Sequence, residues 1–281
     1  MIQARELIIP ESATIEKNVS INCDVFIIGE NCYIGKGVKI NCKSFICGDY
    51  LYMADNVEVG RGGSYGVNSN ITIGNNVGIF ESTIINPSES VTIGDNCGIG
   101  SEVMIWTHGA WLDIFDGFPS SFGPVIIQEN VWLPAKSIVL PNVIIGKNTV
   151  ITINSVINRN IPSGSLAGGN PAKVIKNQIY PKIIKDEDKV LILNQIVSDW
   201  EKLLISKNHE NYTISITSSN HVKLIEDKNI ENIFDFSTKP YKIIGPRSIL
   251  SEDLRDYFRR RGLKIYNGLK FSSIDSNYIQ G

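Results

Sequence analysis

Hydrophobic residues recur every six positions through most of the first 160 residues. A period of six fits neither the 3.6-residue repeat of an α-helix nor the two-residue alternation of an ordinary strand. It is typical of short parallel strands wound into a solenoid, where each apolar side chain stacks on its equivalent one coil away. The pattern runs through Ile9, Ile15, Ile21, Ile28, Ile34, Ile40, Ile46, Met53, Val59, Ile73, Ile79, Ile85, Ile93, Ile99, Ile105, Ile127, Leu133, Val139, Ile145, Ile151 and Ile157.

Phrases such as IGEN, IGNN and IGDN mark the corners of this solenoid. Gly adopts the backbone conformations of a tight bend freely and Asn tolerates them, while β-branched residues suit the flat walls between bends. Cys32 and Cys97 lie four residues beyond a repeat position and are interpreted as interior filler. Cys23 and Cys42 occupy the same place one coil apart, so they are expected to stack as neighbours.

Composition excludes several classes of protein. The 281 residues are enough for two domains, and a net charge of -2 indicates no nucleic-acid partner. No apolar stretch approaches 18 residues and no signal-peptide pattern follows Met1, so neither a transmembrane segment nor secretion is expected. The five cysteines are odd in number and lack C-x-x-C spacing, which favours a reducing, cytoplasmic setting and argues against a zinc site.

Composition changes after the repeat, and a second domain is predicted there. The sequence predicts a helix over 186–207 and a second helix over 251–261, capped by Ser251. Short strands are predicted at YTISIT, HVKLI, NIFDFS, YKII and LKIY. The expected domains are therefore 1–178, a β-helix, and 179–281, a small α+β domain.

An insertion at 107–123 interrupts the repeat, and His108 stands at its edge. An imidazole has an unperturbed pKa of about 6.5, so it can take a proton from a hydroxyl group that is a poor nucleophile by itself. The insertion also carries aromatic and acidic side chains, among them Trp111 and Asp113, which could stack on a sugar ring and accept from its hydroxyls. Anchoring of the loop or packing on another subunit would explain the aromatics equally well.

The segment 123–176, which begins GPVIIQENVWLPAKS and ends AGGNPAKVIK, resembles the hexapeptide-repeat acyltransferases, in particular galactoside, maltose and polysaccharide O-acetyltransferases. The resemblance extends over roughly residues 9–176. It implies a left-handed parallel β-helix, acetyl-CoA as acyl donor without a metal, and a homotrimer with its sites between neighbouring β-helices.

The resemblance also implies roles for individual residues. His108 matches the histidine that serves as general base, and Asn86 matches an asparagine that contacts the acceptor. The positions matching contacts to acetyl-CoA are Trp132, Ala135, Ile153, Asn158, Arg159, Lys173 and Lys176. Two phrases depart from the pattern: W-L-P replaces W-I-G, and T-I-N-S at 152–155 replaces G-A-G-S, so the cofactor groove is expected to differ in shape at these two phrases.

Three functions stay open at this stage. The leading prediction is acetyl transfer to a sugar hydroxyl of a surface polysaccharide or its precursor. N-acetylation of an amino sugar, including a nucleotide-linked one, and a noncatalytic scaffold are the alternatives. The β-helix carbonic anhydrases need three histidines on zinc, whereas His209 and His221 lie beyond the repeat, so that activity is not expected.

Overall fold

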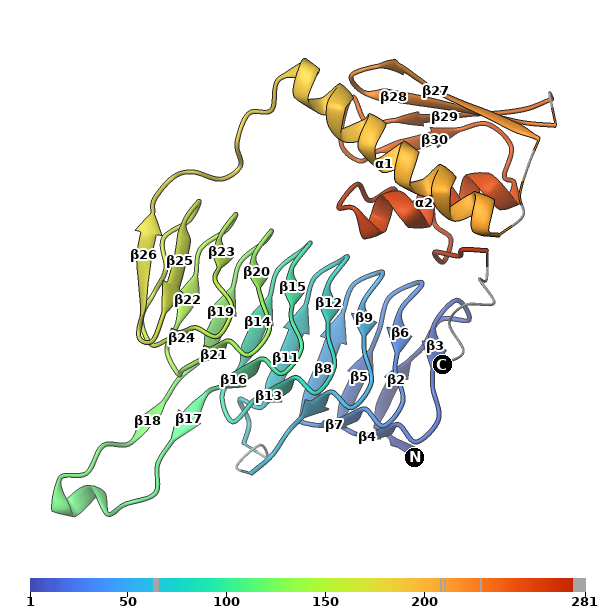
Figure 1. Ribbon diagram of the computed structural model, residues 1–281. Helices are drawn as coiled ribbons and strands as arrows, with labels where there is room; N and C mark the ends of the chain where they lie inside the picture. The colour runs from blue at the N-terminus through green and yellow to red at the C-terminus, as the bar shows by residue number, and fades with distance from the viewer. Residues whose placement is uncertain (63–65, 208, 210, 228, 275–281) are drawn as a thin grey trace. The chain divides into compact units, whose positions relative to one another are not determined.

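The computed structural model describes residues 1–62, 66–207, 209, 211–227 and 229–274. The chain divides into two compact units, Met1–Lys182 and Ile183–Gly281. The first, called the β-helix unit, is built from three sheets of short strands, and the second, the C-terminal unit, from one antiparallel sheet and two helices (Figure 1). The predicted fold class, a left-handed parallel β-helix followed by a small α+β domain, is confirmed.

Each coil of the β-helix unit contributes one strand to each sheet in turn (Figure 1). Sheet A contains β1 (Ile2–Gln3), β4 (Ser20–Asn22), β7 (Lys39–Asn41), β10 (Glu58–Val59), β13 (Ile84–Asn86), β16 (Met104–Trp106), β21 (Ile138–Val139) and β24 (Val156–Ile157). Sheet B contains β2 (Glu6–Ile8), β5 (Val25–Ile27), β8 (Ser44–Cys47), β11 (Asn70–Ile73), β14 (Val91–Ile93), β19 (Val125–Ile127) and β22 (Ile144–Ile145). Sheet C contains β3 (Thr14–Ile15), β6 (Tyr33–Ile34), β9 (Tyr52–Met53), β12 (Gly78–Ile79), β15 (Gly98–Ile99), β20 (Trp132–Leu133), β23 (Val150–Ile151), β25 (Leu166–Gly169) and β26 (Ala172–Lys176).

The repeat positions form the interior of the β-helix unit, as the six-residue period predicts. From Ile21 onward they are buried in one continuous core, with a single exception. Ile46 is 38% exposed, because β8 turns its neighbours Phe45 and Cys47 inward instead. Phe45 stacks on Phe26 of the preceding coil with ring centroids 5.5 Å apart, so a larger aromatic pair replaces the aliphatic stack at this point.

Asparagine closes many of the corners. Asn31, Asn76 and Asn96 have φ values of 57°, 61° and 56°, which lie in the left-handed region where Asn is favoured over other residues with a side chain. Their backbone N–H groups donate across the stack to the corner of the neighbouring coil, as from Asn96 to the carbonyl of Asn75 at 2.9 Å. The recurring Asn therefore sets both the bend and the stacking of the coils.

The C-terminal unit contains α1 (Asp186–Ser206), the antiparallel strands β27 (Tyr212–Ser218), β28 (His221–Glu226), β29 (Ile230–Asp235) and β30 (Lys242–Ile244), and α2 (Ile249–Arg260). Trp200, Phe234 and Phe258 are fully buried at the centre of its core. The cap of α2 is Ser248 rather than the predicted Ser251, which is the third helical residue and completes a capping box with Ser248.

The strand predicted at LKIY, residues 263–266, is wrong. The carbonyl of Ile265 accepts a hydrogen bond from Arg255 Nη1 at 3.1 Å instead of joining a strand ladder. Arg255 is fully buried, pairs with Glu252 at 2.7 Å and also donates to the carbonyl of Lys270 at 2.6 Å. One buried guanidinium on α2 thus holds the segment that follows the helix.

Candidate active site

His108 lies just after strand β16 of sheet A, where the insertion begins. It follows β16 and opens β17 (His108–Gly109), which pairs in antiparallel fashion with β18 (Ser121–Phe122) to form the stem of a projecting loop (Figure 1). The imidazole stacks on the ring of Phe122 with centroids 5.7 Å apart, and the indole of Trp106 approaches it at 6.3 Å. Two aromatic rings therefore hold the plane of the imidazole, and the stem that carries it follows directly from strand β16 of sheet A.

Two polar side chains from the preceding coil contact one nitrogen of this imidazole. His108 Nδ1 lies 2.9 Å from Asn86 Oδ1 and 2.9 Å from Ser88 Oγ. Asn86 pairs with Trp106 in the register of sheet A, which brings Ser88, two residues on, level with His108. Ser88 was not among the predicted site residues, although it lies one coil of 20 residues before His108 in the sequence.

The hydrogen bonds of Asn86 determine which nitrogen of His108 carries the proton. Asn86 is fully buried, and its Nδ2 donates to the carbonyls of Gly60 at 3.0 Å, Gly62 at 3.1 Å and Arg61. Carbonyls only accept, so the amide nitrogen must face them and Oδ1 must face His108. Because Oδ1 is itself an acceptor, Nδ1 has to donate the hydrogen. In neutral His108 the free lone pair is therefore on Nε2.

A buried threonine fixes the stem beside this histidine. Thr107 Oγ1 donates to the backbone carbonyl of Asn86 at 2.8 Å and accepts from the backbone N–H of Glu89 at 2.9 Å. Thr107 is fully buried, so its hydroxyl satisfies two backbone groups that water does not reach. The residue before the catalytic candidate is thus tied to the preceding coil.

The geometry gives Asn86 a different role from the predicted one. All of its polar atoms are used by His108, Ser88 and the backbone of 60–62, and none is exposed to an acceptor. The prediction that Asn86 contacts the acceptor is therefore not supported. Its contacts are those of a residue that orients His108.

The loop beyond the stem is exposed. A short 3-10 helix, η1 (Ile114–Asp116), lies at its tip, and Asp113 caps it by accepting from the backbone N–H of Phe115 at 2.8 Å. Trp111 and Phe115 are each 95% exposed. The predicted sugar contacts of Trp111 and Asp113 stay predictions, and one oxygen of Asp113 already serves the loop itself.

Comparisons with known proteins address the family. No family model matches the chain. It can be superposed on the N-acyltransferase AntD of Bacillus cereus, solved with dTDP and coenzyme A (TM-score 0.47, 20% identity, 62% of this chain and 91% of that one). A galactoside acetyltransferase in complex with coenzyme A gives a TM-score of 0.36 at 24% identity, over 59% of this chain and 68% of that one.

In sequence, the chain is 40% identical over 111 residues to a protein of Saccharomyces cerevisiae named "Putative acetyltransferase YJL218W". The chain is similar to hexapeptide-repeat acetyltransferases. The match covers 38% of this chain and 56% of the yeast protein, so the chain spans little more than half of that relative.

The residues predicted from the sequence to contact acetyl-CoA lie in three places. Asn158 and Arg159 follow β24 at the corner between sheets A and B, the corner that also carries His108. In sheet A, β24 is the second strand beyond β16, and two strand spacings correspond to about 10 Å. Ala135 and Ile153 lie at the corner between sheets C and A, on neighbouring coils joined by the hydrogen bond from Asn154 N to Ala135 O.

The third group lies in sheet C. Lys173 and Lys176 are exposed on β26, and among the described residues neither is held in an ion pair. Trp132 is half-exposed on β20, and its indole lies across Gly98, where an added Cβ would be 2.4 Å from the ring. In a three-sided helix the A–B corner is opposite sheet C, so one chain does not bring these residues together with His108.

The phrase T-I-N-S, which departs from the family pattern, packs against AGGN: a Cβ added to Gly168 would be 1.8 Å from Thr152 Oγ1, and Ser155 Oγ accepts from Gly169 N at 3.0 Å. Among the described residues, no three His, Cys, Asp or Glu side chains are placed to hold a metal ion. Within the same residues, no helix has the length and apolar character needed to span a bilayer.

Proposed function

We propose that this chain is an acetyl-CoA-dependent O-acetyltransferase that acts on a sugar hydroxyl of a surface polysaccharide or its precursor, with His108 as general base. The observation that carries the proposal is the hydrogen bond from His108 Nδ1 to Asn86 Oδ1 at 2.9 Å. It leaves the lone pair of Nε2 to accept a proton, which is the property that a general base requires. The similarity to acetyltransferases supports the identity of the acyl group.

The chemistry follows from that arrangement. His108 Nε2 takes the proton of the acceptor hydroxyl while the hydroxyl oxygen attacks the thioester carbonyl carbon of acetyl-CoA. The tetrahedral adduct then breaks its carbon–sulfur bond, and the thiolate of coenzyme A receives the proton back from Nε2. As His108 becomes positively charged, the Nδ1–H bond to Asn86 Oδ1 strengthens, because a charged donor makes a stronger hydrogen bond.

The class of acceptor can be tested directly. The purified chain is incubated with acetyl-CoA and a panel of neutral glycans, acidic glycans and amino sugars, and release of the free thiol of coenzyme A is followed. Mild alkali cleaves an O-acetyl ester but leaves an N-acetyl amide intact. An alkali-labile product supports the proposal, whereas an alkali-stable product on an amino sugar would replace it with N-acetylation.

We also propose that the active unit is a homotrimer whose sites lie between chains. Lys173 and Lys176 are on sheet C, and His108 is at the opposite corner, so a second copy that lays its sheet C beside that corner would complete the site. The 95% exposed rings of Trp111 and Phe115 are available to pack on such a neighbour.

Subunit mixing tests the shared site. Inactive His108→Ala chains are dissociated and reassembled with inactive chains that carry both Lys173→Ala and Lys176→Ala. If sites are shared, mixed assemblies contain some intact sites and recover part of the activity. No recovery, with mixed assemblies demonstrated by mass spectrometry, would show that each site lies within one chain.

A further inference from the structure

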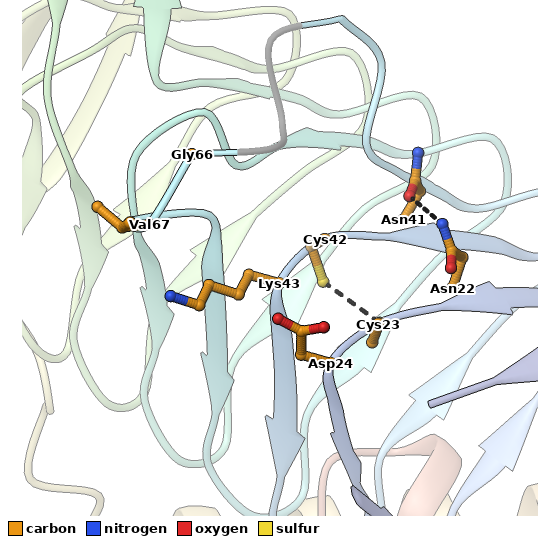
Figure 2. Close-up of a pocket in the computed structure, with 8 residues that line it drawn as sticks. All are labelled: Asn22, Cys23, Asp24, Asn41, Cys42, Lys43, Gly66 and Val67. Carbon is orange, nitrogen blue, oxygen red and sulfur yellow. Dashed lines mark hydrogen bonds between the residues drawn. The ribbon is translucent and has the colours of Figure 1, made fainter. Parts of the chain in front are cut away.

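Two cysteine thiols face each other on neighbouring coils at the N-terminal end of the β-helix unit. Cys23 directly follows β4 and Cys42 directly follows β7, and these strands pair in parallel with Asn22 opposite Asn41. The Sγ atoms are 3.7 Å apart. Figure 2 shows the Sγ of Cys42 directed at Cys23, with the amides of Asn22 and Asn41 joined in the same way beside them.

This pair lines an open pocket. The pocket measures about 360 Å³ and is bounded by Asn22, Cys23, Asp24, Asn41, Cys42, Lys43, Gly66 and Val67 (Figure 2). Cys23 is 8% exposed and Cys42 is 5% exposed. Because both residues line this open pocket, a small reagent can approach their sulfurs from it.

A second close pair provides an internal comparison. Cys32 and Cys47 have their Sγ atoms 3.9 Å apart, nearly the same separation. Cys32, however, is completely buried, and its thiol donates to the carbonyl of Gly48 at 3.3 Å. Cys42 and Cys47 are both 5% exposed, so the two pairs differ in the access of their other thiol, which is 8% exposed in Cys23 and 0% exposed in Cys32.

The backbone around Cys23 and Cys42 suits a covalent bridge. Neighbouring parallel strands lie about 4.8 Å apart, which is inside the range of roughly 4.4–6.8 Å between Cα atoms in disulfides. The sulfurs would need to approach from 3.7 Å to a bond of about 2.05 Å, which requires rotation of the two side chains. The Cβ atoms of a disulfide are about 3.5–4.5 Å apart, so the two coils must also draw slightly closer at this point.

The two thiols are also chemically distinct. The hydrogen bond from Cys42 lowers the pKa of the Cys23 thiol, against the opposing effect of burial. The same contact raises the pKa of Cys42, and burial raises it further. The thiolate is the nucleophilic form of cysteine, so Cys23 is suited to attack first and Cys42 to react second.

We propose that Cys23 and Cys42 form a reversible oxidation site, at which a low-molecular-weight disulfide converts the two thiols into one disulfide between neighbouring coils. The thiolate of Cys23 attacks one sulfur of the reagent and releases one equivalent of its thiol. Cys42 then attacks Cys23 Sγ, displaces the second equivalent, and its proton goes to that departing thiolate. Two hydrogens leave the protein, and the reagent is reduced to two thiols. This site does not depend on the chemistry of His108.

Oxidised glutathione is the probe. The folded full-length chain is incubated with it near pH 8, samples are quenched with acid, free thiols are alkylated, and the protein is analysed by intact mass and peptide mapping. We expect loss of two hydrogens, a Cys23–Cys42 linked peptide that forms at least tenfold faster than a Cys32–Cys47 peptide, and reversal by dithiothreitol. The ratio follows from access, because the sulfur separations are alike.

Variants assign the order of the steps. In Cys42→Ala we expect glutathione to persist on Cys23, since no second thiol displaces it. Cys97→Ala is the matched control, because Cys97 is a buried cysteine of the same β-helix outside both pairs, and it should oxidise like the unmodified chain. Circular dichroism establishes that each variant is folded.

Several results would overturn the proposal. One is a folded, unmodified chain that forms no Cys23–Cys42 link while the unfolded chain oxidises readily. Another is a Cys32–Cys47 link that forms equally fast, which would mean that access to the pocket does not control the reaction. A loss of two hydrogens that persists in Cys42→Ala would place the disulfide elsewhere.

Discussion

Replacing Asn86 by alanine tests how the protein orients His108. The substitution removes the acceptor that holds Nδ1–H at 2.9 Å and the donor that ties the side chain to the carbonyls of Gly60 and Gly62. Neutral His108 then loses its preference for the form with the lone pair on Nε2. We expect fewer chains to hold a base in position at any moment, and therefore a lower rate of acetyl transfer.

The magnitude can be worked out from the contacts. A hydrogen bond of this kind contributes a net 0.5–1.5 kcal/mol, which corresponds to roughly a 2- to 13-fold change in rate. Ser88 Oγ stays 2.9 Å from Nδ1 and can accept in place of Asn86, so a loss near the upper value is expected only when Ser88→Ala is added. The loss should stay below that of removing His108 itself, which is about 10²- to 10⁴-fold for a positioned base.

The assay is steady-state release of coenzyme A with the acceptor found in the panel. A fall in kcat with an unchanged KM for acetyl-CoA is expected. Asn41→Ala is the control, because Asn41 ends β7 at the same place on sheet A, and its amide bonds with Asn22 rather than with a histidine. If Asn86→Ala lowered activity equally in chains that already carry His108→Ala, the positioning argument would be refuted.

Three further predictions concern single residues. Arg255→Met removes the buried partner of the Glu252 carboxylate, which then keeps only the exposed Arg247 at 4.0 Å, and should destabilise the C-terminal unit by about 3–5 kcal/mol in urea unfolding; an unchanged midpoint would contradict this. Burial raises the pKa of Cys97 to about 11, so at pH 8 iodoacetamide should alkylate it roughly 100-fold more slowly in the folded than in the unfolded chain; comparable rates would count against it. Hydrogen bonds from Ser237 lower the pKa of Asp235, so its stabilising contribution is present above pH 3.8 and is lost as pH falls through the lowered value. Between pH 5 and pH 3 the Asp235→Asn variant should therefore lose less thermal stability than the unmodified chain, and an equal loss would show that this carboxyl contributes nothing.

The period of the sequence was enough to predict the β-helix because each coil repeats the same local physics. Ile79, Ile99 and Ile105 are buried as their spacing predicts, and Asn76 and Asn96 adopt the left-handed conformation of a corner. Ile46 breaks the pattern because Phe26 and Phe45 stack in the interior beside it. Periodicity considers each position by itself. It therefore does not reveal that two aromatic residues stacked one coil apart can point inward in place of the residue at the repeat position.

The environment of His108 was less predictable than its position. The interruption of the repeat identified the residue, but the contact with Asn86 depends on hydrogen-bonding direction, which the sequence does not encode in any local phrase. The C-terminal unit illustrates the same limit. Its helices followed from apolar spacing, whereas the strand predicted at LKIY is absent, because the buried Arg255 from elsewhere in the chain takes the carbonyl of Ile265. Local propensity does not report such a tertiary competitor.

The most direct test of the central claim is the rate of acetyl transfer to a hydroxyl acceptor by His108→Ala, measured in a single turnover with saturating acetyl-CoA. The general-base account predicts a rate about 10²- to 10⁴-fold below that of the unmodified chain, with the circular dichroism spectrum and thermal midpoint unchanged. A folded His108→Ala chain that transfers acetyl groups at the rate of the unmodified chain would contradict it.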